Sequence, residues 1–100
     1  MGNGECGVSQ SAHVQMYSSM MCPFCYRAKA LLDHKGVEVE IFDVDGDFAL
    51  RQQMETRSGR HTVPQIFIND AHIGGCDELY ALERGQQLDS LLAEPTARAL

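Results

Sequence analysis

MMCPFCYRAKALL, residues 20–32, holds two cysteines, Cys22 and Cys25, separated by a Pro-Phe pair. Pro23 suits the first position of a helix, because an amide hydrogen there would have no partner inside the helix. Apolar residues follow at helical spacing until a glycine stops the pattern, so the stretch predicts a helix over residues 23–35. The cysteine pair therefore lies where a helix begins.

The sequence on both sides of this helix alternates between strand and helix patterns. Alternating apolar and polar residues predict strands at 13–17 and 37–43. A run of residues that favour strands predicts another at 65–68, and a short strand at 72–73 follows the turn after it. Further helices are predicted at 47–58, after Gly74-Gly75, and at about 88–92. Parallel strands joined by a helix need a right-handed crossover, and the Asn69-Asp70 turn adds a hairpin. We therefore expect an α/β fold with a mixed four-stranded sheet and helices on both faces.

Length and composition limit the possible functions. The 100 residues suffice for one domain, and a net charge of −6 argues against nucleic acid as a partner. No apolar run approaches the length that spans a bilayer, and the start does not resemble a signal peptide. We therefore expect no membrane association and a cytoplasmic location. In a reducing cytoplasm, four cysteines indicate redox or metal chemistry rather than structural disulfides.

Composition also sets the expected domain limits. Residues 1–12 are rich in glycine and serine and lack periodicity, so we predict a flexible N-terminal tail in which Cys6 is incidental. One domain is expected over residues 13–94, followed by a frayed C-terminus at residues 95–100.

Two chemistries are open to a C-x-x-C pair. Amides at the start of a helix stabilise a thiolate, so Cys22 is the expected nucleophile and Cys25, one turn further in, the expected resolving thiol. The alternative is a zinc site, with Cys76, His61 and His72 as partners. Structural zinc commonly takes four ligands from two such pairs, and this chain offers one pair. We therefore favour redox catalysis and expect no metal.

Three motifs together resemble a known family. CPFC at a strand-to-helix turn, SGRHTVPQIFI at 58–68 and GGCDEL at 74–79 resemble a dithiol glutaredoxin of the thioredoxin-like superfamily, similar to the small bacterial members. The resemblance implies a thioredoxin-like fold with strand order 2-1-3-4. It also implies a glutathione-dependent thiol-disulfide oxidoreductase, a monomer with glutathione as co-substrate. Such enzymes reduce protein disulfides and protein-glutathione mixed disulfides, and so serve electron transport and cell redox homeostasis.

The resemblance further implies two groups of glutathione contacts. The first is the loop Thr62, Val63 and Pro64, called the TVP loop below, in which the Val63-Pro64 bond is cis and the Val63 backbone pairs with the cysteinyl part of glutathione. Phe24 stands where the family more usually has a tyrosine. Its ring would still pack on glutathione, without the phenolic hydrogen bond.

The second implied group is Gly75, Cys76 and Asp77, at the start of a helix. Exposed helix amides there receive the γ-glutamyl carboxylate, and the acidic side chain meets its amino group. Asp77 has the alternative role of an ordinary helix cap. For Cys76 we favour a backbone contact, with little contribution from its thiol.

The chain departs from the family pattern at Ser19. Many glutaredoxins have a lysine three residues before the first cysteine, where it meets the glycine carboxylate of glutathione. Arg57 and Arg60, beside the TVP loop, are the candidates to replace that charge. An exposed arginine is, however, more often only a solvated charge.

Two other functions compete with this interpretation. Some glutaredoxins hold an iron-sulfur cluster between two subunits, but Pro23 argues against this, because cluster-binding dithiol members usually have a smaller residue there. A thioredoxin would have a Gly-Pro pair between its cysteines and a tryptophan beside them, and this chain has no tryptophan. The sequence therefore favours a redox glutaredoxin.

Overall fold

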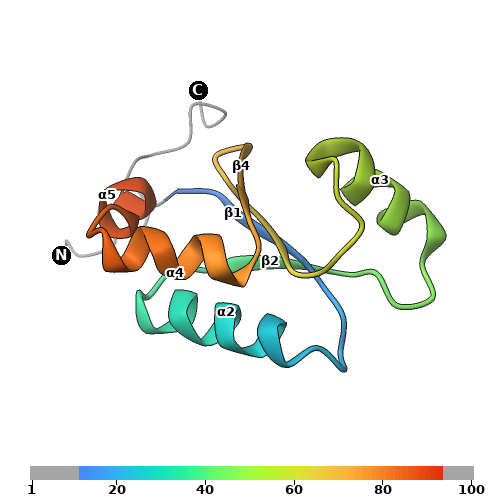
Figure 1. Ribbon diagram of the computed structural model, residues 1–100, viewed down its shortest axis with the longest axis horizontal. Helices are drawn as coiled ribbons and strands as arrows, with labels where there is room; N and C mark the ends of the chain where they lie inside the picture. Colours follow the sequence, from blue (N-terminus) through green and yellow to red (C-terminus); the bar gives the residue numbers. More distant parts are fainter. Residues whose placement is uncertain (1–11, 94–100) are drawn as a thin grey trace, which may run out of the picture.

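Four strands form a mixed sheet in the predicted order β2-β1-β3-β4 (Figure 1). The computed structural model describes residues 12–93. The strands are β1 (Val14–Ser18), β2 (Val39–Asp43), β3 (Gln65–Ile68) and β4 (Ala71–Gly74). β1 pairs in parallel with β2 and antiparallel with β3, and β3 pairs antiparallel with β4.

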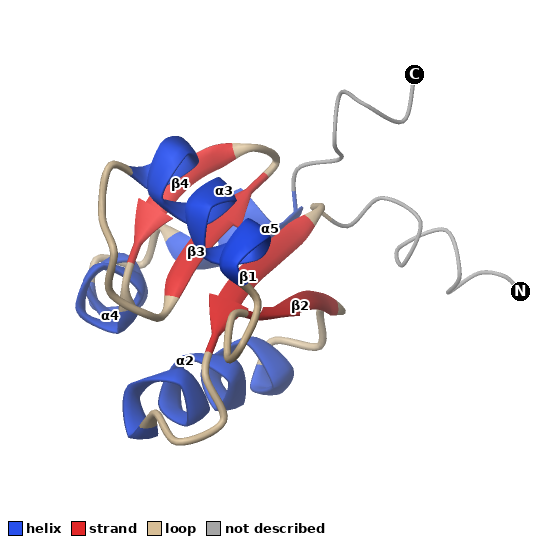
Figure 2. Cartoon of the chain, turned by 90° about the vertical axis from the view of Figure 1, so that its right-hand side faces the viewer, coloured by secondary structure: helices blue, strands red, loops and turns tan. Residues whose placement is uncertain are grey.

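Helices cover both faces of the sheet, as predicted. They are α2 (Pro23–His34), α3 (Phe48–Ser58), α4 (Cys76–Arg84) and α5 (Leu88–Ala93). Leu32, Leu79 and Leu88 bring α2, α4 and α5 into one buried cluster on one face. On the other face, Met54 of α3 packs in a second cluster with Tyr17. Figures 1 and 2 show α3 on its own side of the sheet.

Local sequence signals set several element ends. Asp47 caps α3 by accepting a hydrogen bond from the Leu50 amide at 3.0 Å, and Gly59 ends this helix with φ +72°. Asn69 and Asp70 have φ of 50° and 70°, and a two-residue hairpin turn with both central residues in this region matches the twist of the strands. The predicted hairpin is therefore confirmed.

Three of the four strands have boundaries one or two residues away from the prediction. β1 covers Val14–Ser18 rather than 13–17. β2 begins at Val39, two residues later than expected, because the turn at Gly36 follows α2 and pairing with β1 starts with Val14 opposite Val39. β4 covers Ala71–Gly74 rather than 72–73, because its pairing with β3 continues through a register shift.

The chain ends lie mostly beyond what the structure describes. The predicted tail falls outside the described residues except for Ala12, and the predicted frayed end at residues 95–100 falls entirely outside them. Ala12 is buried, and its amide donates a hydrogen bond to the Leu92 carbonyl at 3.0 Å. Within residues 12–93, no helix is long and apolar enough to cross a membrane.

Three loops meet at one edge of the sheet. β1 and β4 both run antiparallel to β3, so the ends of β1 and β4 lie at the same edge as the start of β3. The CPFC motif follows β1, the TVP loop precedes β3, and Gly75 follows β4. The fold therefore gathers the three motifs that the sequence places far apart.

Candidate active site

Cys22 caps the first turn of α2. Its backbone is extended, with φ −106° and ψ 108°, and its Sγ accepts a hydrogen bond from the Cys25 amide at 3.2 Å. The side chain is half-buried, and Sγ lies 3.7 Å from the Val63 carbonyl oxygen. The predicted nucleophile therefore lies at a helix N-terminus, in contact with the TVP loop.

Cys25 lies on the buried side of the same turn. Burial, followed by its hydrogen bond with the Cys22 side chain, raises the pKa of the Cys25 thiol to about 12. A hydrogen bond with the Ser19 backbone acts in the opposite direction and lowers this pKa. Cys25 therefore keeps its proton at neutral pH. The buried, protonated Cys25 fits the predicted role of the resolving thiol.

The TVP loop faces Cys22 from the start of β3. The Val63-Pro64 bond is cis, which confirms that prediction. Thr62 is exposed, Val63 half-buried and Pro64 buried, so the loop presents its first two residues to solvent beside the nucleophile.

The start of α4 forms the opposite wall. Gly75 is the N-cap of α4 and Asp77 lies exposed in its first turn, so the alternative role of Asp77 as the cap is wrong. A Cβ added at Gly75 would lie 3.2 Å from the Pro64 carbonyl oxygen. A larger residue there would crowd the TVP loop, which explains why the two motifs meet at a glycine.

Glu78 belongs to this wall and was missed in the sequence. Its Oε1 accepts a hydrogen bond from the Gly75 amide at 2.7 Å and lies 3.6 Å from Arg60 Nη1. The Gly75 hydrogen bond is the largest cause that lowers the pKa of Glu78, so the carboxylate is charged at neutral pH. An acid three residues after an N-cap is a capping-box signal, which would have identified it.

An open hollow of about 220 Å³ lies between these walls. It is lined by every predicted glutathione contact: Phe24, Thr62, Val63, Pro64, Gly75, Cys76 and Asp77. Arg60, Glu78 and Gln65 line it as well. The structure thus brings both predicted groups of contacts into one groove, with a positive charge from Arg60.

Arg57 does not reach this groove. Its guanidinium lies 3.9 Å from the centre of the Phe67 ring and donates hydrogen bonds to Tyr17 Oη at 2.8 Å and Gln15 Oε1 at 3.0 Å. These partners hold it on the face of the sheet that α3 covers. Its proposed role as the replacement cation was therefore wrong, and Arg60 remains the candidate.

Ser19 is tied to the loop after β2. Its Oγ donates a hydrogen bond to Asp45 Oδ1 at 2.8 Å, and the Met20 amide donates one to Asp45 Oδ2 at 3.0 Å. The Met20 hydrogen bond is the largest cause that lowers the pKa of Asp45, which is thus charged at neutral pH. At this position the chain has a tether for the active-site loop in place of the family's lysine.

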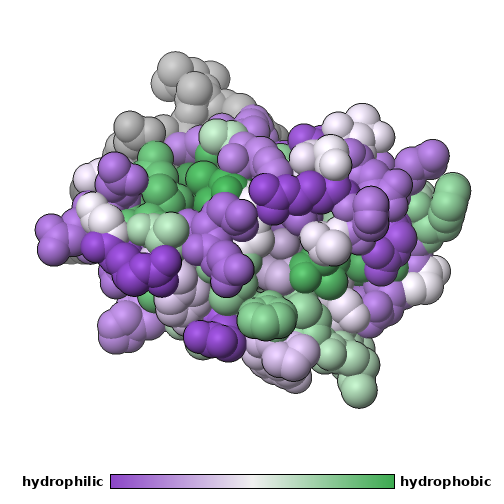
Figure 3. All heavy atoms as spheres, viewed as in Figure 1, coloured by the Kyte–Doolittle hydropathy of each residue, from purple (hydrophilic) through white to green (hydrophobic). Residues whose placement is uncertain are grey.

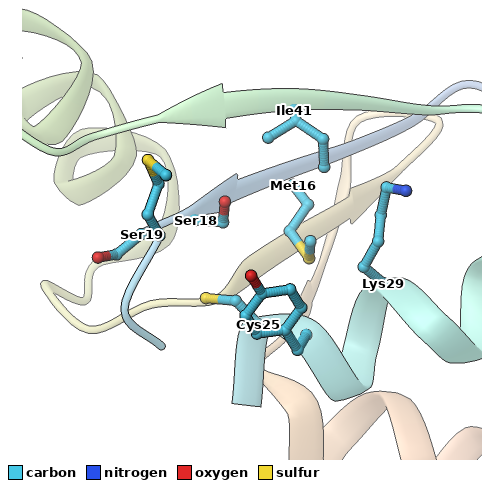
Figure 4. A pocket seen from close by; sticks show the side chains of 8 residues that line it. Met16, Ser18, Ser19, Cys25, Lys29 and Ile41 are labelled. Carbon is cyan, nitrogen blue, oxygen red and sulfur yellow. The ribbon is translucent and has the colours of Figure 1, made fainter. Parts of the chain in front are cut away.

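A second hollow, of about 280 Å³, opens on the other side of Cys25. Figure 4 shows Met16 of β1, Ile41 of β2 and Lys29 of α2 around it. Met20, which also lines it, is largely exposed, and Figure 3 shows apolar atoms gathered near the start of α2. The dithiol therefore lies between a polar groove and a more apolar hollow.

The residues weighed as zinc ligands do not form a metal site with one another. Among residues 12–93, no group of three or more histidine, cysteine or acidic side chains is placed to hold a metal ion. Cys22, Cys25 and Cys76 are free thiols.

This combination defines a class of protein: a thioredoxin-like fold with a dithiol at a strand-to-helix turn, beside a cis-proline loop. Comparison with known proteins identifies the family. The glutaredoxin family model matches residues 14–73, and the chain belongs to the glutaredoxins, a family of oxidoreductases.

Individual relatives agree with this assignment. The chain is 56% identical over 81 residues to glutaredoxin 3 of Escherichia coli K12, covering 81% of this chain and 98% of that protein. The solution structure of glutaredoxin from Brucella melitensis has a TM-score of 0.74 and 51% identity, over 84% of this chain and 91% of that one. A buckwheat glutaredoxin-glutathione complex has a TM-score of 0.74 and 28% identity, over 88% and 82% of the two chains.

Proposed function

We propose that the protein is a glutathione-dependent enzyme that reduces protein-glutathione mixed disulfides and protein disulfides through its CPFC dithiol. Its family implies thiol redox chemistry with glutathione. The main support for the proposed reactions is the groove beside Cys22, which is lined by every residue predicted to contact glutathione.

The groove suggests how glutathione would lie. The cysteinyl part of glutathione pairs with the Val63 backbone, which places its sulfur beside Cys22. The Gly75 amide is already bonded to Glu78, so the γ-glutamyl carboxylate is received by the first-turn amides of Cys76 and Asp77, which have no partner inside the helix. The exposed Asp77 carboxylate meets the amino group of the ligand.

Reduction of a mixed disulfide needs one protein thiol. The Cys22 thiolate attacks the glutathionyl sulfur, a Cys22-glutathione disulfide forms, and the substrate leaves as a thiolate that takes a proton from water. A second glutathione thiolate then attacks the glutathionyl sulfur bound to Cys22. Oxidised glutathione leaves, and the Cys22 thiolate is restored.

Reduction of a protein disulfide needs both thiols. Cys22 attacks one substrate sulfur, and Cys25 then loses its proton and attacks Cys22, which releases the reduced substrate and leaves a Cys22-Cys25 disulfide. Two glutathione molecules reduce that disulfide and leave as oxidised glutathione. The buried position of Cys25, directly behind Cys22, supports this role.

The expected setting follows from this chemistry. We expect a monomer in the cytoplasm, where glutathione keeps thiols reduced, with disulfide-containing or glutathionylated proteins as partners. The test is the rate at which the purified protein catalyses glutathione-dependent reduction of a small mixed disulfide. A rate no higher than that of glutathione alone would refute the proposal, and visible absorption of anaerobically purified protein would instead indicate a bound iron-sulfur cluster.

We expect Arg60→Ala to weaken glutathione binding. Arg60 lines the groove and is about half exposed, so the lost contact is worth roughly 1 kcal/mol, or about a fivefold rise in the KM for the mixed disulfide, with kcat little changed. The matched control is Arg84→Ala, because Arg84 is an exposed arginine in the last turn of α4. This substitution should leave KM unaltered. Equal KM values for the two variants would remove Arg60 from the binding site.

Cys76→Ser should retain activity. Burial raises the pKa of the Cys76 thiol, so the group is protonated at neutral pH, and its proposed contact with glutathione uses the backbone. We expect kcat and KM within about twofold of wild type, with a loss of about 1–2 kcal/mol in unfolding free energy from the buried hydroxyl. A folded variant with a tenfold loss of turnover would show that the thiol takes part in the reaction.

A further inference from the structure

Gln65, the first residue of β3, directly follows Pro64 of the TVP loop. Its side chain is almost completely buried, at 1% exposure. A buried amide without partners is costly, so the positions of its hydrogen bonds indicate what the residue holds in place.

Both ends of the Gln65 amide are bonded. Its Nε2 donates to the Thr62 carbonyl oxygen at 3.0 Å and lies 3.3 Å from Thr62 Oγ1. Its Oε1 lies 2.7 Å from His72 Nε2. Because the amide oxygen only accepts, His72 Nε2 must carry a hydrogen and donate it. The amide thus connects β4 to the first residue of the TVP loop.

The sheet itself fixes His72. Its ring packs against Phe67 with 5.1 Å between ring centres, and the pairing of β3 with β4 sets His72 opposite Phe67, next to the register shift between Ile66 and Phe67. Burial is the largest cause that lowers the pKa of His72, followed by the positive charge of Arg60. Neutral and protonated rings can both carry a hydrogen on Nε2, so the contact with Gln65 does not depend on the charge of the ring.

We propose that Gln65, oriented by His72, is a positioning residue that fixes the TVP loop in the shape that binds glutathione. This inference rests on the proposed function. Residues 60–64 form no helix or strand of their own, and Thr62 is exposed, so the backbone around Val63 depends on side chains for its position. The same loop lies 3.7 Å from the Cys22 sulfur, and a small displacement of a substrate-aligning group can cost a large factor in rate.

The test replaces Gln65 with methionine, which has a similar length and no hydrogen bonds. We expect the KM for a small glutathione mixed disulfide to rise at least fivefold. The rate at which iodoacetamide alkylates Cys22 should remain unchanged, because the start of α2 is untouched. A rise in KM accompanied by a fall in the alkylation rate would indicate general damage to the site and overturn the proposal.

Gln15→Met is the matched control. Gln15 is the other buried glutamine of the sheet, and its amide bonds to Arg57 and Glu40 instead of the TVP loop. It should lose a comparable set of hydrogen bonds and keep a wild-type KM. Similar KM values in the two variants would mean that Gln65 has only a structural role.

His72→Phe tests the inference separately if Gln65→Met does not fold. Phenylalanine keeps the ring packing on Phe67 but removes the donor to Gln65 Oε1. We expect a KM rise smaller than that of Gln65→Met, with kcat little changed, and an unaltered KM would contradict the proposed pair. An inactive wild-type protein would instead count against the proposed function, so the two failures are distinguishable.

Discussion

Cys22→Ser abolishes reduction of both mixed disulfides and protein disulfides in this account. Every proposed reaction begins with attack by this sulfur, and a serine hydroxyl is almost fully protonated at neutral pH. We expect a loss on the order of 1,000-fold or more in kcat/KM for both substrates. The measurement is glutathione-dependent turnover of each substrate by the variant beside wild type.

The fold should survive this substitution. Cys22 is the N-cap of α2 and its side chain accepts the Cys25 amide hydrogen bond, a role that serine fulfils well. A thermal melt close to that of wild type would therefore accompany the loss of activity. Substantial remaining turnover would mean that another thiol attacks, and turnover by a Cys22→Ser, Cys76→Ser double variant would show whether that thiol is Cys76.

Cys25→Ser separates the two reactions. Only protein-disulfide reduction requires the second thiol, so we expect its rate to fall about 100-fold or more, while mixed-disulfide reduction stays within a few-fold of wild type. The substrate protein should accumulate as a disulfide with Cys22, because nothing inside the enzyme displaces it. Gel analysis without reductant would detect this adduct.

The raised pKa of Cys25 also predicts how the rate of protein-disulfide reduction changes with pH. Burial is the largest cause that raises the pKa of the Cys25 thiol, and burial persists when Cys22 is in a mixed disulfide, so the reactive thiolate fraction of Cys25 increases as pH rises. If resolution limits the rate, turnover of protein disulfides by wild type should increase from pH 7 to pH 9, and the Cys25→Ser variant should lack this increase. Equal losses of both activities in Cys25→Ser would contradict the division of labour.

Much of the fold was predictable because its signals are local. Pro23 at the start of a helix, Asp47 at an N-cap and the Asn69-Asp70 turn each depend on a few neighbouring residues. The start of β2 was misplaced because pairing with β1, which lies far away in the sequence, decides where that strand begins.

The site was less predictable where side chains interact across the fold. Arg57 and Arg60 are near neighbours in the sequence, yet Arg57 packs on Phe67 behind the sheet, while Arg60 lines the groove. Gln65 gave no sign of its role either, because its partner His72 lies on the next strand across a register shift. Such contacts depend on which face of an element a residue occupies in the assembled sheet.

The central claim is that Cys22 reacts with glutathione bound in the groove beside it. Mass spectrometry of the Cys25→Ser protein after incubation with oxidised glutathione tests this most directly. The Cys22 thiolate should form one disulfide with glutathione and release the other half as reduced glutathione, and peptide mapping should locate the adduct at Cys22 alone. No adduct, or an adduct mainly at Cys6 or Cys76, would contradict the account.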